Sequence, residues 1–395
     1  MQRTIQSEKV AQALGILRKL GVDCWLTFVR ETSEQPDPVL KLTVGHDVTW
    51  QSAFILTKDG HRIAIVGRYD AELVREVGLY LTIRTYDAGI APILLETIEE
   101  LRPQQIAINY SLGDVAADGL THGMYLQVVD ALKGTPYEQR LVSSAAIVAS
   151  LRARKTSSEL ERMREAIAIT NEIYAAVNTY LKPGVTERAV CDLMHTEVQR
   201  RGLGTSWEWD HCPIVQTGPE AAVGHGGPTD RIIEAGHLVH IDFGVRHRSY
   251  CSDMQRMWYV RRSGETGLPA SMQKAWDACV GAIEAGKQIL KPGIAGWQVD
   301  KAARDYLVAA GYPEYQHALG HSVGQACHDG GPLLGPRWPR YGETPDRVVE
   351  EGSVFTLELG TMTEAGYIGL EDEVLVTADG CEFLSPFQRE VWYVG

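Results

Sequence analysis

The sequence predicts an α+β protein with two domains: a small N-terminal α/β domain, and a larger C-terminal domain with internal pseudo-twofold symmetry. Three observations lead to this prediction. Helical and strand patterns alternate over residues 7–133, a long helical pattern begins near residue 158, and the chain beyond that point contains an internal repeat. We expect the two domains to cover residues 1–145 and 150–395.

The composition excludes several classes of protein. The 395 residues are 44% apolar and 23% charged, which is ordinary for a globular protein and excludes a disordered chain. The formal net charge of −13 argues against a nucleic-acid or anionic-membrane partner. No apolar run reaches the ~20 residues that span a bilayer, and the N-terminus is typical of an amphipathic helix, not of a signal peptide. The seven scattered cysteines are typical of reduced thiols, so we expect a cytoplasmic protein.

The N-terminal domain is predicted from element patterns in chain order. Residues 7–20 form a helical pattern with apolar residues on one face. Residues 52–57 and 61–66 predict a β-hairpin, because Asp59-Gly60 between them supplies the left-handed turn geometry. The other predicted elements are a strand at residues 23–28, a helix at 92–101, a strand at 105–110 and a helix at 120–133. This domain contains no phosphate-binding loop and no GxGxxG motif.

The C-terminal domain is predicted to begin with a long helix. Ser158 and Glu161 have the spacing of a capping box, in which each side chain bonds the other's backbone N–H. Apolar residues then recur at helical spacing over the next five turns.

An internal repeat follows this helix. The tetrapeptide Leu-Lys-Pro-Gly occurs at residues 181–184 and again at 290–293, an offset of 109 residues. Such a tetrapeptide is a common helix stop and alone carries little weight. The glycines that close the next helix, Gly202 and Gly311, keep the same offset and favour a true duplication. Two copies of helix–helix–strand predict a pseudo-twofold fold with a cleft between its halves.

Each half of the repeat carries a pair of acidic residues in a predicted strand hairpin. Asp242 lies inside an apolar strand, and Asp253 follows 11 residues later on the predicted return strand, where the two carboxylates can face each other. Glu358 and Glu371 repeat the arrangement in the second half. A buried carboxylate is costly unless it is paired or binds a cation, so these pairs predict a metal site. Glu371 taken alone is also compatible with a solvated acidic run, because Asp372 and Glu373 follow it.

Histidines lie between the two hairpins. His317, His321 and His328 occur within one short segment. Four carboxylates with one or two imidazoles suit Mn²⁺, Co²⁺, Zn²⁺ or Fe²⁺. Two such ions bridged by carboxylates form the usual two-metal hydrolytic centre.

The order and spacing of these motifs resemble those of a known family. IDFG, SDMQR, GHSVG, TLELG and LEDEVLVT follow one another as in the pita-bread metallopeptidases, which include methionine aminopeptidase, aminopeptidase P, prolidase and the metal-free creatinase. The resemblance covers about residues 150–395 and implies a pita-bread domain there. A separate N-terminal α/β domain is similar to the creatinase, prolidase and aminopeptidase P branch.

The resemblance also implies roles for individual residues. The implied metal ligands are Asp242, Asp253, His321, Glu358 and Glu371. Asp242 would bind one metal, His321 and Glu358 the other, and Asp253 and Glu371 both, with Glu358 also acting as the general base. His225, His317 and His328 match family histidines that line the substrate pocket and help to stabilise the tetrahedral intermediate.

Two positions depart from the family pattern. Leu359 stands where a proline often follows the ligand glutamate, and Gly369 stands where proline-directed members have an arginine that orients the substrate or its carboxylate. Arg337 and Arg340, on a loop rich in glycine and proline, are candidate substitutes that would bind the substrate carboxylate. The alternative is that both arginines belong to a solvated loop.

Three functional hypotheses follow. The first is a cytoplasmic metallopeptidase that uses two divalent metal ions, Mn²⁺ by preference with Co²⁺ or Zn²⁺ as alternatives. It would cleave the Xaa-Pro bond of dipeptides, as prolidase does, or the N-terminal residue of short peptides, as aminopeptidase P does. The family often forms dimers, so we expect a homodimer that acts on small proline-containing peptides. The second hypothesis is a metal-dependent C–N hydrolase of a small non-peptide amide or amidine. The third, a non-catalytic binding module, is disfavoured because the ligand set is complete.

Overall fold

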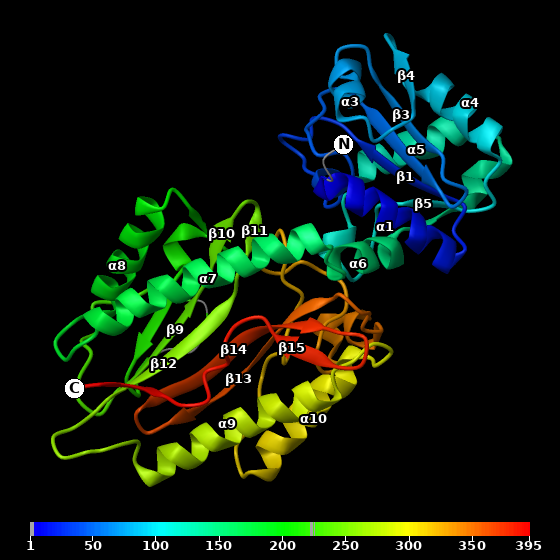
Figure 1. The fold of residues 1–395 in the computed structure, drawn as a ribbon. Helices are drawn as coiled ribbons and strands as arrows, with labels where there is room; N and C mark the ends of the chain where they lie inside the picture. Colours follow the sequence, from blue (N-terminus) through cyan, green and yellow to red (C-terminus); the bar gives the residue numbers. More distant parts are fainter. Residues whose placement is uncertain (1–3, 222–223, 225) are drawn as a thin grey trace. The chain divides into compact units, whose positions relative to one another are not determined.

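The structure is a computed structural model that describes every residue except 1–3, 222–223 and 225. The chain divides into two compact units, Met1–Arg152 and Ala153–Gly395 (Figure 1). No helix of the described residues is long and apolar enough to cross a membrane.

The N-terminal unit is built on a six-stranded mixed sheet with the strand order β4-β3-β2-β1-β5-β6. β2 and β3 form the predicted antiparallel hairpin, and Gly60 in its turn has a φ of +99°. The other neighbours pair parallel except for β1 and β2. The strands are β1 (Cys24–Val29), β2 (Ser52–Thr57), β3 (Arg62–Gly67), β4 (Thr82–Tyr86), β5 (Ile106–Ile108) and β6 (Leu141–Ser143).

Helices cover both faces of this sheet, and each face has its own apolar core. α1, α3 and α6 pack on one face, around Trp25, Phe54 and Val66. α4 and α5 pack on the other, around Leu26 and Ile55. The helices are α1 (Ile5–Leu20), α2 (Leu40–Thr43), α3 (Ala71–Val77), α4 (Ala91–Leu101), α5 (His122–Leu132) and α6 (Ala145–Ala153). The elements predicted for residues 7–133 are confirmed, whereas α2, α3, β4 and β6 had no prediction.

The second unit opens with α7 (Ser157–Tyr180), and its cap differs from the prediction. The capping box joins Thr156 and Glu159, so the prediction of Ser158 with Glu161 was wrong by two residues. Both pairs have the required spacing. Thr156 has the extended backbone that a cap needs, whereas Ser158 already lies inside the helix.

The second unit contains a seven-stranded sheet whose main path runs β13-β14-β12-β9-β8, with β15 beside β14 and β16 beside β12. A small second sheet joins β7, β10 and β11. The strands of the large sheet are β8 (Ile214–Thr217), β9 (Leu238–Phe243), β12 (Met254–Val260), β13 (Val354–Thr363), β14 (Gly366–Val376), β15 (Cys381–Phe383) and β16 (Trp392–Val394). Those of the small sheet are β7 (Gly204–Thr205), β10 (Val245–His247) and β11 (Tyr250–Cys251).

Two helix pairs cover the apolar side chains of this sheet. α7 and α8 (Glu187–Arg200) pack on Ile241 and Phe243 of β9. α9 (Ala270–Ile289) and α10 (Gly296–Ala309) pack on Leu357 of β13 and Leu370 of β14. Because successive side chains of a strand point to opposite faces, the acidic residues that alternate with these apolar ones face away from the helices.

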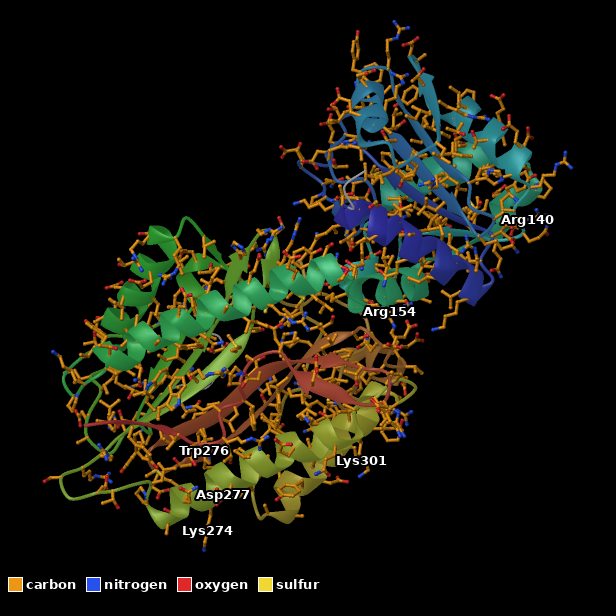
Figure 2. The ribbon with its side chains drawn as sticks, in the orientation of Figure 1. Arg140, Arg154, Lys274, Trp276, Asp277 and Lys301 are labelled. Carbon is orange, nitrogen blue, oxygen red and sulfur yellow. The ribbon has the colours of Figure 1, made fainter. Side chains whose placement is uncertain are left out.

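Helix α9 shows this division between a buried and a solvated side. Trp276 is buried, and its indole N–H donates a hydrogen bond to the backbone oxygen of Arg389 at 2.8 Å. Its neighbours Lys274 and Asp277 are exposed and project away from the sheet (Figure 2). The helix thus buries one stripe of side chains against the strands, as an amphipathic helix does.

The repeat is visible in the backbone as well as in the sequence. Gly184 N–H donates to Ile233 O at 2.9 Å, and at the equivalent place Gly293 N–H donates to Val349 O at 3.0 Å. Both glycines have a φ near +90°, at 92° and 91°. Each half consists of two packed helices followed by an antiparallel strand pair, β9/β12 in one and β13/β14 in the other (Figure 1). The second unit therefore has the internal symmetry that the repeat predicted.

Candidate metal centre

A row of four polar side chains crosses the centre of the large sheet. Gln255 of β12 pairs directly with Asp242 of β9 on one side and with Glu371 of β14 on the other. Glu371 in turn pairs with Glu358 of β13. Directly paired residues project from the same face of a sheet, so the three carboxylates and the amide share one face.

The position of Asp253 differs from the prediction. It lies just before β12 and not on the strand, so Gln255, not Asp253, is directly opposite Asp242. The short pair β10/β11 forms the tip of this connection, and Ser252 and Asp253 leave the ladder where the chain re-enters β12. Gly244 accommodates this bend, because a Cβ there would lie 1.8 Å from Ser252 O.

His321 brings together carboxylates from both halves of the repeat. Its Nε2 lies 3.6 Å from Asp253 Oδ2, 3.7 Å from Glu358 Oε1 and 3.8 Å from Glu371 Oε1. His321 and Glu358 are partly accessible, with 14% and 19% of their side chains exposed, whereas Asp253 and Glu371 are buried. The structure thus places four of the five predicted ligands around one point.

The fifth residue, Asp242, belongs to the same electrostatic cluster. Burial and the neighbouring Glu358 raise the pKa of Asp242 to about 8. Burial and Asp253 likewise raise the pKa of Glu358 to about 8. Burial, followed by the surrounding carboxylates, raises the pKa of Asp253 and of Glu371 well above the ordinary values. All four pKa values are raised for the same reason: it is energetically unfavourable to bring several negative charges close together away from water.

The described residues do not neutralise this charge. No described lysine or arginine forms an ion pair with the four carboxylates, and burial together with His328 lowers the pKa of His321 to about 3. Asp242 Oδ1 and Glu371 Oε1 are buried and have no hydrogen-bond partner among the residues that the structure describes. Carboxylate oxygens with a neutral imidazole form a donor set suited to first-row divalent metals. The residues present therefore fit a metal centre.

Neighbouring groups hold the ligands in place. Glu373 Oε1 accepts a hydrogen bond from Asp253 N–H at 2.9 Å. His321 forms two hydrogen bonds with Thr356. The His321 backbone N–H donates to Thr356 Oγ1 at 3.1 Å, and the His321 backbone oxygen accepts from the Thr356 backbone N–H at 2.9 Å. Gly320 permits this approach, because a Cβ there would lie 1.9 Å from Thr356 O. The loop that follows is held by a buried ion pair between Lys155 and Asp329, with Nζ and Oδ2 2.9 Å apart.

The other predicted histidines are only partly placed. The His328 ring lies edge-on to the His321 ring with the centroids 4.4 Å apart, so it adjoins the centre. His317 is exposed, and its ring lies 5.5 Å from that of Tyr315. His225 lies outside the residues that the structure describes.

Arg337 and Arg340 lie on the surface. Arg337 forms an ion pair with Asp346 and stacks on the ring of Trp297 at 4.1 Å. Arg340 bonds the backbone oxygen of Gln316 and lies 4.5 Å from the centroid of the Trp338 ring. The role of either arginine toward substrate stays a prediction.

Several residues at the centre had no prediction. Cys327 Sγ lies 2.9 Å from Asp253 Oδ2 and forms a close group with His321 and His328. The one feature of the sequence that could have drawn attention to Cys327 is its position directly before His328. His240 and Gln255 are also buried there, and burial lowers the pKa of His240 to about 4. Neither could be assigned from the sequence, because both act through contacts across strands.

Gly369 adjoins the same residues. A Cβ at this position would lie 2.5 Å from Gln255 Oε1 and 2.7 Å from His240 Nε2. The space in which the resemblance led us to look for an arginine is thus occupied by a neutral amide and an imidazole. With the side chains placed as they are, only glycine fits beside them without displacing Gln255, Tyr367 or His240.

Comparison with known proteins now decides the family. The model of metallopeptidase family M24 matches residues 161–378, which is more than half of the chain and includes all five predicted ligands. The chain belongs to metallopeptidase family M24. The prediction of a pita-bread metallopeptidase is confirmed at this level, and membership in M24 implies divalent metal ions.

Relatives of similar sequence carry the name of uncharacterized peptidases. The uncharacterized peptidase YqhT of Bacillus subtilis is 28% identical over 277 residues, which are 69% of this chain and 72% of the relative. An uncharacterized peptidase of Staphylococcus saprophyticus is 31% identical over 246 residues, 61% of this chain and 65% of its own.

Solved structures of similar fold extend over nearly the whole chain. The Xaa-Pro dipeptidase from Bacillus anthracis has a TM-score of 0.73 at 24% identity and covers 98% of this chain and 99% of its own. The dipeptidase PepE from Mycobacterium ulcerans has a TM-score of 0.74 at 23% identity and covers 99% of this chain and 98% of its own. These likenesses confirm the predicted α+β fold.

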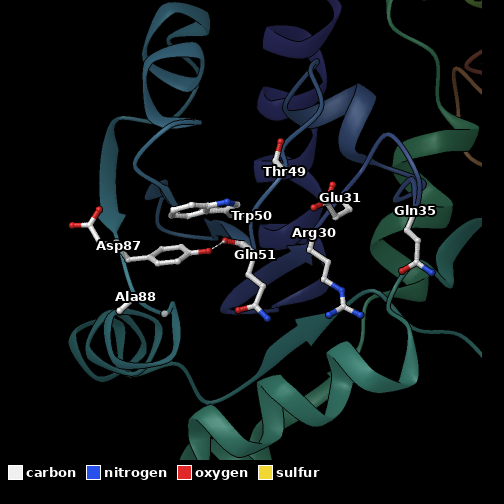
Figure 3. Close-up of a pocket in the computed structure, with 10 residues that line it drawn as sticks. Arg30, Glu31, Gln35, Thr49, Trp50, Gln51, Asp87 and Ala88 are labelled. Carbon is white, nitrogen blue, oxygen red and sulfur yellow. Dashed lines mark hydrogen bonds between the residues drawn. The ribbon is translucent and has the colours of Figure 1, made fainter.

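A separate hollow lies in the N-terminal unit (Figure 3). It has a volume of about 690 Å³ and is lined by Trp50, Tyr86 and Arg30 among others. Tyr86 Oη donates to the backbone oxygen of Gln51 at 2.7 Å, which fixes one wall. No residue that the sequence predicts for catalysis lines this hollow.

Proposed function

We propose that this M24 enzyme is a two-metal hydrolase that cleaves the Xaa-Pro peptide bond. Its substrates would be dipeptides or the N-terminal residue of short proline-containing peptides. The observation that carries the proposal is the approach of His321 Nε2 to three carboxylates that no described cation neutralises. The names of the structural neighbours, among them an Xaa-Pro dipeptidase and an X-Pro aminopeptidase, favour this substrate class.

The five ligands would hold two ions, with Mn²⁺ as the first candidate and Co²⁺ or Zn²⁺ as alternatives. Asp242 would hold one ion, and His321 with Glu358 the other. Asp253 and Glu371 would hold both. When bound, the ions would lower the pKa of a water molecule and polarise the scissile carbonyl.

Glu358 is the proposed general base. With 19% of its side chain exposed it is more accessible than Asp253 and Glu371, so water can reach it. Its carboxylate would take a proton from the attacking water and deliver it to the departing proline nitrogen. His328, next to His321, and His317 and His225 would donate hydrogen bonds to the oxygen of the tetrahedral intermediate.

A proline-terminated substrate brings a carboxylate that needs a partner. Arg337 and Arg340 are the proposed candidates. Arg340 is the better placed of the two, because it bonds the backbone oxygen of Gln316, the residue before His317. We also propose that the enzyme is a cytoplasmic homodimer.

The test is a substrate panel with defined metals. Chelated protein would be assayed with Mn²⁺, Co²⁺ and Zn²⁺ on Xaa-Pro dipeptides, longer Xaa-Pro peptides, matched Xaa-Ala peptides and small amides. The proposal expects metal-dependent cleavage of Xaa-Pro bonds and little cleavage of Xaa-Ala bonds. Cleavage of Xaa-Ala peptides at an equal rate would contradict the proline specificity.

One observation favours a second candidate function. Gly369, Gln255 and His240 give the centre a neutral polar wall instead of a guanidinium. Such a wall suits a substrate without a carboxylate, so the alternative is a metal-dependent hydrolase of a small non-peptide amide or amidine. Metal-dependent turnover of small amides in the same panel, without turnover of any Xaa-Pro peptide, would select it.

A further inference from the structure

We propose that Gln255 is a positioning residue for Glu371, and that His240 fixes the orientation of the Gln255 amide. The inference rests on the proposed function, since it concerns Glu371 as a metal ligand. Neither residue belongs to the predicted ligand set, and both act on the centre through hydrogen bonds.

The geometry forms a chain of three buried side chains. His240 Nε2 lies 2.8 Å from Gln255 Oε1, and Gln255 Nε2 lies 2.9 Å from Glu371 Oε2. The three residues are only 5%, 7% and 2% exposed. The strand register supports the contact, because Gln255 and Glu371 are directly paired across β12 and β14.

The chemistry of the partners determines the direction of these bonds. A carboxylate that binds a metal ion is ionised and can only accept hydrogen bonds, so Gln255 must present its NH₂ group to Glu371 in the metal-bound centre. Its carbonyl oxygen then faces His240, whose Nε2 must carry a hydrogen and donate a hydrogen bond to that oxygen. If the amide were flipped, its oxygen would face the Glu371 carboxylate oxygen, and its NH₂ group would face the N–H of His240. Both contacts would be repulsive. His240 Nδ1 is buried and has no hydrogen-bond partner among the described residues, so a proton there would be left unpaired, whereas a proton on Nε2 is bonded. His240 therefore disfavours the amide orientation that would repel Glu371.

The consequence for Glu371 is an unequal use of its two oxygens. Oε2 is held by Gln255, whereas Oε1 has no hydrogen-bond partner among the described residues and lies 3.8 Å from His321 Nε2. The backbone of Glu371 is also held, since Arg256 donates to its carbonyl oxygen at 3.2 Å. Oε1 of Glu371 is thus the oxygen left available to the proposed ions. Groups that orient a ligand in this way commonly change metal affinity by ~10–100-fold.

The glycine at position 369 is a second observation that supports the His240–Gln255 contact. A Cβ there would meet Gln255 Oε1 at 2.5 Å and His240 Nε2 at 2.7 Å, the two atoms that bond each other. The backbone of Gly369 does not require glycine, since its φ is not in the left-handed region. The glycine leaves space for the His240–Gln255 bond and for the ring of Tyr367, whose Cε1 would lie 2.6 Å from the Cβ.

The test compares metal affinities of full-length variants. Chelated wild type and Gln255→Leu would be titrated with Mn²⁺ by calorimetry, and we expect the variant to bind ~10–100-fold more weakly. The matched control is Gln388→Leu. Gln388 is another buried glutamine bonded to β12, but both of its bonds go to the backbone of Met257. Both variants should lose thermal stability, because each loses buried hydrogen bonds, but the control should keep the wild-type affinity for Mn²⁺.

A double-mutant cycle tests the role of His240. His240→Phe should weaken Mn²⁺ binding, and the double variant should bind no more weakly than Gln255→Leu alone, because His240 acts through Gln255. Additive losses would contradict the chain of bonds.

Equal affinity of wild type and Gln255→Leu would overturn the proposal. If Gln255→Leu does not fold, the test uses His240→Phe instead. An affinity of His240→Phe for Mn²⁺ equal to that of wild type would then overturn the proposal. A wild-type protein that binds no Mn²⁺, Co²⁺ or Zn²⁺ would instead refute the proposed function.

Discussion

His321 and Asp253 come from different halves of an internal repeat, yet His321 Nε2 lies 3.6 Å from Asp253 Oδ2. Asp253 lies directly before β12 of the first half, and His321 belongs to a segment whose backbone is hydrogen-bonded to Thr356 of β13 in the second half. Neither half contains the whole ligand set. The proposed centre therefore depends on both copies of the repeat folding together.

The first prediction concerns Asp253. Asp253→Ala should remove bound metal and activity together, with a loss of activity well beyond the ~10–100-fold typical of groups outside the ligand set. Metal content by mass spectrometry and turnover of an Xaa-Pro dipeptide measure both. Asp277→Ala, on the exposed side of α9, is the matched control and should match wild type in both. Full activity of Asp253→Ala would refute the two-metal mechanism.

The second prediction concerns Glu358. Glu358→Gln keeps the size of the side chain and removes the proposed general base, so kcat should fall by ~10²–10⁴-fold. Its metal affinity should fall as well, because one ligand becomes neutral. Single-turnover assays at saturating metal separate the two effects. A variant that is fully metal-loaded and retains wild-type kcat would show that another group takes the proton.

The third prediction concerns pH and metal removal. In the folded protein without metal, the pKa values of Asp242 and Glu358 are raised to about 8 from ordinary values of 3.8 and 4.5. The folded state then binds more protons than the unfolded state across this range, so the stability of the metal-free protein falls as pH rises. Acidification from about pH 8 to about pH 6 should raise the Tm of chelated protein.

Metal-loaded protein should respond in the opposite direction, because protons compete with metal for the same carboxylates. The gap in Tm between loaded and chelated protein should therefore narrow on acidification. Differential scanning fluorimetry at several pH values measures this gap. A gap that stays constant with pH would show that the carboxylates do not titrate as a metal-linked cluster.

The fourth prediction concerns the buried ion pair that holds the histidine loop. Lys155→Met leaves Asp329 charged and buried, and such a loss typically costs ~3–5 kcal/mol of unfolding free energy. Lys301→Met, which removes an exposed pair with Asp305, should have a far smaller effect. Urea-induced unfolding of the two variants gives the comparison. Equal effects would mean that the Lys155 pair contributes nothing beyond a surface contact.

The fifth prediction concerns the anchoring of the substrate. Arg340→Ala and Arg337→Ala would each be assayed on an Xaa-Pro dipeptide and on its C-terminally amidated analogue. A carboxylate anchor gives a large loss on the free acid and a small loss on the amide. We expect this pattern for Arg340. Small and equal losses of activity on both substrates would show that these arginines belong to a solvated loop and do not bind the substrate.

The secondary structure and the general position of the acidic residues could be predicted because both depend on local pattern and burial. An Asp inside an apolar strand, as at Asp242, is costly without a cation, and this cost is readable in the sequence. The cap of α7 was misplaced because two pairs share one spacing, and only the backbone of Thr156 distinguishes them.

The register of the site could not be predicted. The turn formed by β10 and β11 shifts Asp253 off its strand and places Gln255 opposite Asp242, and this shift depends on how the small sheet pairs. Cys327, His240 and Gln255 escaped prediction for a related reason. Their significance comes from neighbours that lie far away in the sequence, such as Asp253 and Glu371.

The measurement that tests the two-metal centre most directly is a Mn²⁺ titration of chelated protein with simultaneous readout of bound metal and of Xaa-Pro dipeptide hydrolysis. A two-metal centre predicts that activity appears with added metal and saturates at two ions per chain, and that Asp253→Ala shows neither binding nor activity. Activity that survives complete removal of metal, or a fully active protein with a single bound ion, would contradict it.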